Sequence, residues 1–188
     1  GKSDRETWIS LSQVYEKAKN YDEQAKAIEA ADKLSTSNEE KENIYFLRGA
    51  MYERQKKFEQ AEAEFRKALK LNPESAAAAN YLGYMLADRN TRLNEALELI
   101  QKAVAAEPNN GAYLDSLGWV FYRLNRLDEA AEQLRRSLER GSRDPTVHDH
   151  LGDVYSSQNK LKDAISQWDK ALREWHSNAP SDVDQVEV

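Results

Sequence analysis

The chain has 188 residues, of which 32% are charged, and 33 acidic against 27 basic residues give a formal net charge of −6. The absence of cysteine excludes disulfides, thiolate metal ligands and a cysteine nucleophile. The negative charge disfavours nucleic acid as a ligand, because it repels phosphate backbones and attracts basic partners. No apolar run reaches the roughly 18 residues of a spanning helix, so we expect no membrane insertion by this segment. We interpret the start at Gly1 as that of an excised or processed piece, which leaves the compartment open between periplasm and cytoplasm.

From its start, the sequence repeats one pattern five times. A glycine recurs in four of the repeats at intervals of 34, 35 and 34 residues, and a serine takes its place in the first. These residues are Ser12, Gly49, Gly83, Gly118 and Gly152. The units cover about 5–38, 42–75, 76–110, 111–144 and 145–178. A fixed period of this length is typical of helical repeats, so the expected fold is all-α, with two helices in each unit.

The two helices of each unit carry different packing patterns. The first has apolar or small side chains at i, i+3, i+4 and i+7, the spacing of one helix face. The second has a small residue, a large one four positions later, and a small one three positions after that. The triplets are Ala61, Phe65 and Ala68; Ala96, Ile100 and Ala103; Ala130, Leu134 and Ser137; and Ala164, Trp168 and Ala171. Because neither helix can bury its face alone, we expect the hairpins to stack.

Turn and break residues separate these helices. Asn125 and Asn159 stand where hairpins must turn, and Asn tolerates the left-handed backbone that ends a helix. Ser37 and Glu40 have the spacing of a capping box before the second unit. Later units are preceded by Pro73, Pro108 and Pro145, which disfavour helix at the residue before them.

These repeats resemble the tetratricopeptide repeat (TPR) family, in which Leu-Gly and an aromatic residue are followed by Ala, a bulky apolar residue, Ala and Pro. The resemblance spans about 5–178. Segments 81–88, 113–119 and 148–153 are similar to the C-terminal arrays of larger bacterial repeat proteins, some of them lipoprotein adaptors. Departures include Ser12, Gln24 and Arg48. The resemblance implies a right-handed superhelical solenoid of five helix-turn-helix hairpins that acts as a non-catalytic scaffold or adaptor.

The resemblance also implies a binding groove for a protein or peptide. In this family the first helices line a concave face, and residues one step from the packing stripe point into it. The predicted partner-binding residues are Asn80, Tyr81, Tyr84, Asp88, Asp115, Trp119, Tyr122, Asp149 and Asp153. Aromatic and acidic side chains together favour an extended, partly apolar and basic peptide. The alternative is that Trp119 and Tyr84 only pack between adjacent first helices.

No residues indicate catalysis, a cofactor or a metal. His148 and His150 lie two apart, and such residues point about 200° away from each other on a helix. We therefore expect His148 to fill a packing slot and His150 to lie at the surface. No Ser, His and Asp set has motif support. RNA binding, known for a related helical repeat, is the rival on architecture alone, and the acidity of the chain opposes it.

The end of the chain provides the alternative function. The last expected helix, about Leu161 to Trp175, carries large apolar residues on the side that a following helix would cover. These residues are Ile165, Leu172 and Trp175. They predict a structural scaffold that self-associates as a homodimer through this end. The segment 179–188 is acidic and contains no base, so we expect a flexible tail.

Overall fold

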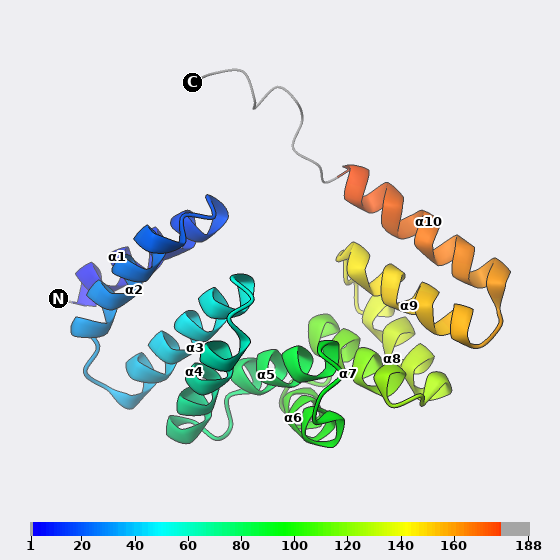
Figure 1. Ribbon diagram of the computed structural model, residues 1–188, viewed down its shortest axis with the longest axis horizontal. Coiled ribbons are helices and arrows are strands. Elements are labelled where there is room, and N and C mark those ends of the chain that lie inside the picture. The colour runs from blue at the N-terminus through cyan, green and yellow to red at the C-terminus, as the bar shows by residue number, and fades with distance from the viewer. Residues whose placement is uncertain (1, 178–188) are drawn as a thin grey trace, which may run out of the picture. The chain divides into compact units, whose positions relative to one another are not determined.

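The computed structural model describes residues 2–177, and this part of the chain forms ten α-helices and no strand (Figure 1). The helices are α1 (Lys2–Lys17), α2 (Tyr21–Lys33), α3 (Asn38–Arg54), α4 (Phe58–Leu71), α5 (Ala76–Asp88), α6 (Leu93–Ala106), α7 (Gly111–Arg123), α8 (Leu127–Glu139), α9 (Pro145–Ser157) and α10 (Leu161–Ser177). The predicted all-α fold is confirmed. The predicted tail, 179–188, lies outside the described residues.

The helices are grouped in two compact units, Gly1–Met85 and Leu86–Val188, and the boundary falls within α5. In the first unit, α1 pairs with α2 and α3 with α4, and α2 also packs against α3. In the second, α7 pairs with α8 and α9 with α10, while α6 packs against α7 and α8 against α9. The expectation of a single array over 5–178 stays a prediction.

In the hairpins α3–α4, α7–α8 and α9–α10, the two helices approach closely at a glycine of the first helix. A Cβ added at Gly49 would lie 2.7 Å from Phe65 Cε1, and one at Gly118 would lie 2.6 Å from Leu134 Cγ. Gly152 meets the indole of Trp168 in the same way. The predicted slot of small against large residues is therefore present in both units, and it brings the two helix backbones close together.

Tight turns join the helices within each hairpin. Asn125 and Asn159 have φ of 59° and 60°, as predicted, and the next residue donates its N–H to a carbonyl five positions back. This is the Schellman arrangement that ends a helix. Lys19 and Lys56 take the same left-handed position in the first unit, with φ of 54° and 58°. Their sequence gives no signal for that backbone, because lysine carries a Cβ that disfavours it.

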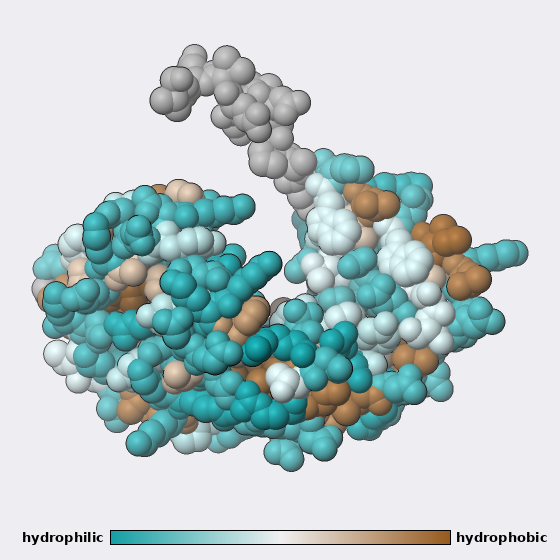
Figure 2. All heavy atoms as spheres, viewed as in Figure 1, coloured by the Kyte–Doolittle hydropathy of each residue, from teal (hydrophilic) through white to brown (hydrophobic). Residues whose placement is uncertain are grey.

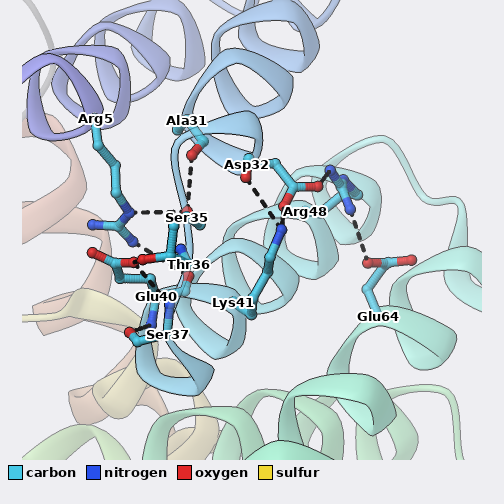
Figure 3. Close-up of polar contacts among 10 residues, drawn as sticks. All are labelled: Arg5, Ala31, Asp32, Ser35, Thr36, Ser37, Glu40, Lys41, Arg48 and Glu64. Carbon is cyan, nitrogen blue, oxygen red and sulfur yellow. Dashed lines mark hydrogen bonds and ion pairs between the residues drawn. The ribbon is translucent and has the colours of Figure 1, made fainter. Parts of the chain in front are cut away.

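The loop before α3 contains the predicted capping box. Glu40 donates its backbone N–H to Ser37 Oγ at 3.1 Å, and its carboxylate accepts the backbone N–H of Ser37 at 3.0 Å. Backbone hydrogen bonds from Thr36 and Ser37 lower the pKa of Glu40 to about 2. Arg5 of α1 reaches this loop and donates from Nε to Ser35 Oγ at 3.0 Å (Figure 3). The first hairpin is thus fixed to the start of the second.

An ion-pair network centred on Asp32 links α2 and α3 in the first unit (Figure 3). Asp32 contacts Lys41 at 2.7 Å and Arg48 at 3.0 Å. Arg48 also lies 3.7 Å from Glu64 of α4, whose side chain is 9% exposed. Arg48 stands where units three to five carry leucine, so charge pairing takes the place of apolar packing there. Beside the network, α2 and α3 share an apolar cluster of Ile28, Ala31, Ile44 and Met51.

We expect Gly118→Ala to lower the free energy of unfolding by about 1–3 kcal/mol, because the new Cβ would overlap buried Leu134. In an open helical position the same change would stabilise by up to about 1 kcal/mol. Gly111→Ala on the same helix is the control, since its Cβ would come no nearer than 3.3 Å to Ser142. Urea unfolding measures both variants, and equal stability of the two would contradict the packing described.

The Asp32 network predicts a loss of stability in acid. Burial raises the pKa of Asp32, but the hydrogen bonds from Lys41 and Arg48 outweigh it and hold that pKa below 3.8. The ionised carboxylate therefore stabilises the fold above pH 3.8, and this contribution is lost as the pH falls through the folded-state pKa. Asp32→Asn should lower stability at neutral pH and reduce its dependence on acid. Asp22→Asn, an exposed change on the same helix, should leave the acid profile of urea unfolding unaltered.

Candidate functional site

Five of the predicted partner-binding residues lie on α7 and α9, which are in contact in the second unit. Asp115, Trp119 and Tyr122 follow one stripe of α7, and Asp149 and Asp153 lie one turn apart on α9. We call these five residues the α7–α9 face. It combines two aromatic rings with three carboxyl groups.

The indole of Trp119 lies between two other rings. It stacks on Tyr122 with centroids 5.0 Å apart and on His150 with centroids 4.1 Å apart. As a result Trp119 is only 8% exposed, which differs from the exposed aromatic surface that its position off the packing stripe indicated. Most of the Trp119 side chain is therefore buried by packing between the first helices α7 and α9, which was the alternative considered for this residue. Tyr122 remains half-buried.

His150 is buried, so the expectation of a surface position was wrong. Its Nδ1 lies 2.9 Å from Asp115 Oδ1, and its ring covers Trp119. Asp115 and His150 are 35 residues apart, whereas the repeat interval here is 34, so the counterpart of Asp115 is Asp149 and His150 follows it by one position. The repeat spacing therefore gave no direct signal for this contact. Asp115 is consequently engaged by a neighbour, and its side chain is 13% exposed.

His148 fills a packing slot between α9 and α10, as expected. Its Nδ1 lies 2.7 Å from Gln167 Oε1, and its Nε2 lies 3.6 Å from Glu174. Within residues 2–177, no three His, Cys, Asp or Glu side chains are grouped so that they could hold a metal ion.

Asp149 and Asp153 are half-buried carboxyl groups on one side of α9. Asp153 accepts a hydrogen bond from Trp168 Nε1 at 3.3 Å. Burial raises the pKa of Asp153 above 3.8, and the negative charge of Asp149 raises it further. Neither carboxylate forms an ion pair with Lys or Arg in the described part of the chain. This side of α9 therefore has a local excess of negative charge.

The remaining predicted groove residues lie on α5. Tyr81 packs edge-on against Phe46 at 5.0 Å between centroids, within the first unit. Asn80 is buried and Tyr84 is half-buried. Asp88 is exposed at the end of the helix and belongs to the second unit. Their part in partner binding stays a prediction.

The apolar residues predicted to mediate self-association are exposed on α10. Ile165 is 63%, Leu172 50% and Trp175 42% exposed, and Leu161 continues their stripe at 56%. Hydrophobic side chains are visible on the surface over α10 (Figure 2). In the part of the chain that the structure describes, no helix is both long and apolar enough to span a lipid bilayer.

Sequence profiles of the tetratricopeptide repeat match residues 6–38, 46–111 and 85–145, which together cover more than half of the chain. Over 104 residues, or 55% of this chain, it is 40% identical to the TPR repeat-containing protein PA4667 of Pseudomonas aeruginosa. It is also 38% identical over 68 residues, or 36% of its length, to cell division cycle protein 27 homolog B of Arabidopsis thaliana. These matches cover 18% and 9% of the two relatives, so the chain spans less than a fifth of either.

Solved structures share the fold. PilW, a type IV pilus biogenesis factor, superposes with a TM-score of 0.79 and 24% identity over 92% of this chain and 78% of its own. PilF of Pseudomonas aeruginosa superposes with a TM-score of 0.76 and 19% identity over 92% of this chain and 77% of its own. MamA of Desulfovibrio magneticus superposes with a TM-score of 0.69 and 18% identity over 94% of this chain and 98% of its own. At these identities the likeness extends to the fold alone.

Proposed function

Because the chain belongs to the tetratricopeptide repeat family, we propose that its second unit binds a basic, partly apolar segment of a partner protein on the α7–α9 face. Proteins of this family are protein-interaction scaffolds and generally carry no catalysis. The family thus supplies the class of function. The basic character of the partner is inferred from the charges and rings on this face.

The observation that carries the proposal is the uncompensated charge of Asp149 and Asp153. Two carboxylates one helical turn apart repel each other, and partial burial weakens their solvation. A Lys or Arg side chain from a partner would relieve both effects. It would also gain strength from the partly desolvated surroundings, where charge pairing is less screened than in water. The raised pKa of Asp153 is the local sign of this imbalance.

The rings of the α7–α9 face favour apolar contact. Tyr122 exposes part of its ring, whose far side rests on Trp119. Trp119 in turn is held by His150, and His150 by Asp115. We assign Asp115 and His150 the role of positioning this stack rather than of contacting the partner. An aromatic surface fixed in this way can pack against a peptide without losing much rotamer freedom.

We expect Asp149→Asn to weaken the binding of a basic peptide by roughly fivefold, or about 1 kcal/mol, because one of two attracting charges is removed. The probe is the tightest binder among synthetic peptides that combine Lys or Arg with Leu or Phe, measured by calorimetry. Asp163→Asn on exposed α10 removes the same charge elsewhere in the unit and serves as the control. Equal affinities of the two variants would refute the assignment of this face.

The pH profile tests the same pair of carboxylates. Protonation of Asp153 removes an attracting charge, and its pKa is raised, so binding should weaken from a pH above 3.8. In Asp149→Asn the neighbouring negative charge is absent, so the weakening should move to lower pH. A profile that does not shift between wild type and Asp149→Asn would show that Asp153 is not coupled to the ligand.

The exposed stripe on α10 supports self-association as a second candidate function. Large apolar residues on consecutive turns of one helix mark a contact surface when nothing covers them. If this stripe forms a dimer, the double variant Leu172→Ser and Trp175→Ser should be monomeric in sedimentation equilibrium at concentrations where wild type is dimeric. Lys170→Ser, an exposed change on the same helix, should leave the dimer intact. A monomeric wild type would exclude this function.

A further inference from the structure

An open pocket of about 310 Å³ lies at the tips of the hairpins in the second unit. Its lining comes from the turn after α5, the end of α7 with the turn that follows, and the end of α9. The lining residues are Asn90, Tyr122, Arg123, Asn125 and Ser157. None of them is acidic, although the protein carries 33 acidic residues and a net charge of −6. The pocket shares Tyr122 with the α7–α9 face but differs from that face in charge.

Arg123 provides the positive charge of the pocket. One guanidinium nitrogen donates to the backbone carbonyl of Asp88 at 3.2 Å, and the guanidinium carbon lies 5.6 Å from the centroid of the Trp119 ring. Its Nε is buried and has no hydrogen-bond acceptor. No carboxylate pairs with Arg123 in the described part of the chain. Arginine does not lose its proton in proteins, so this is a fixed and uncompensated charge.

The other lining residues add neutral donors. Asn90 and Asn125 have φ of 53° and 59°, so both turns hold the left-handed backbone that Asn accepts. The side chains of Asn90, Asn125, Tyr122 and Ser157 make no hydrogen bond with the described residues. Two amides and two hydroxyl groups therefore remain able to donate around Arg123. A cation that pairs with no carboxylate, in a lining of neutral donors, is the composition expected of an oxyanion site.

We propose that this pocket binds a carboxylate, supplied by an Asp or Glu side chain of a partner protein. A single guanidinium fork matches the two oxygens of a carboxylate, and such charge-assisted pairs are about twice as strong as neutral hydrogen bonds. A phosphate dianion fits less well, because only one cation lines the pocket and the negative field of the whole protein opposes a second charge. The charge of this pocket comes from Arg123, which is not one of the residues of the α7–α9 face, so the proposal does not depend on the contact with basic residues.

The test uses acetyl-Gly-Glu-Gly-amide as the probe, with the Gln and phosphoserine analogues as matched peptides. The Nε–H resonance of Arg123 in the ¹⁵N-labelled protein reports binding, and Arg123→Lys assigns it. We expect a saturable shift with the Glu peptide and at least about tenfold weaker binding of the Gln peptide, since the charge-assisted pair is lost. The probe has no basic group, so its binding is independent of whether the α7–α9 face binds basic peptides.

Variants locate the binding. Binding to the variants is followed through the backbone amide resonances of the pocket. Arg123→Gln should reduce the affinity for the Glu peptide by at least about tenfold. Arg135→Gln, which changes an exposed arginine on α8, should bind this peptide as wild type does. If Arg123→Gln unfolds, the double variant Asn125→Gly and Ser157→Ala tests whether the peptide binds in the pocket. Glycine keeps the left-handed turn, and binding should fall several-fold with circular dichroism unchanged.

Three results would overturn the proposal. Equal binding of the Gln and Glu peptides would show that charge recognition is absent. An equal loss in Arg135→Gln would show that a diffuse field rather than the pocket attracts the peptide. Tighter binding of the phosphoserine peptide would assign the pocket to phosphoryl groups instead of carboxylates.

Discussion

The close approach of two helices at a residue without a side chain is the constraint on which the hairpins α3–α4, α7–α8 and α9–α10 depend. Phe65 fits against Gly49 and Leu134 against Gly118, and each large residue is fully buried. Because the contact fixes how the two backbones cross, it also fixes which residues of the first helix face away from the second helix of the hairpin. The stripe of α7 that carries Asp115, Trp119 and Tyr122 is a consequence of that geometry.

The charged side chains of the two units differ in whether they are paired. In the first unit, Asp32, Arg48 and Glu64 compensate one another and hold three helices together. In the second, Asp149 and Asp153 on one side and Arg123 on another lack such compensation in the described residues. Opposite charges brought into contact contribute to the fold, while charges without a partner remain available to a ligand. Whether a charged side chain has an oppositely charged partner therefore distinguishes the groups that stabilise the fold from the candidate binding groups.

The repeat made the fold predictable, because the glycine slot and its large partner recur at a fixed spacing. The sequence therefore shows the same helix–helix contact in several units. The same periodicity predicted the turns at Asn125 and Asn159. It placed Trp119 on an exposed stripe of α7, whereas that ring is mostly buried. It could not predict the turns at Lys19 and Lys56, where the packed helices impose a backbone that lysine does not favour. It also failed for His150, because the burial of that ring depends on Asp115 and Trp119 of the preceding hairpin, and a single unit contains neither.

The turn between α5 and α6 departs from the regular spacing, with two left-handed residues, Asn90 and Arg92, where the other hairpins use one. The extra residue lies in the turn, outside the bounds of both helices. Such a position can gain or lose a residue without disturbing the core, and its side chains are then free to diverge between copies of the repeat. The regular positions make one hairpin interchangeable with another, whereas an irregular tip gives its hairpin an individual surface.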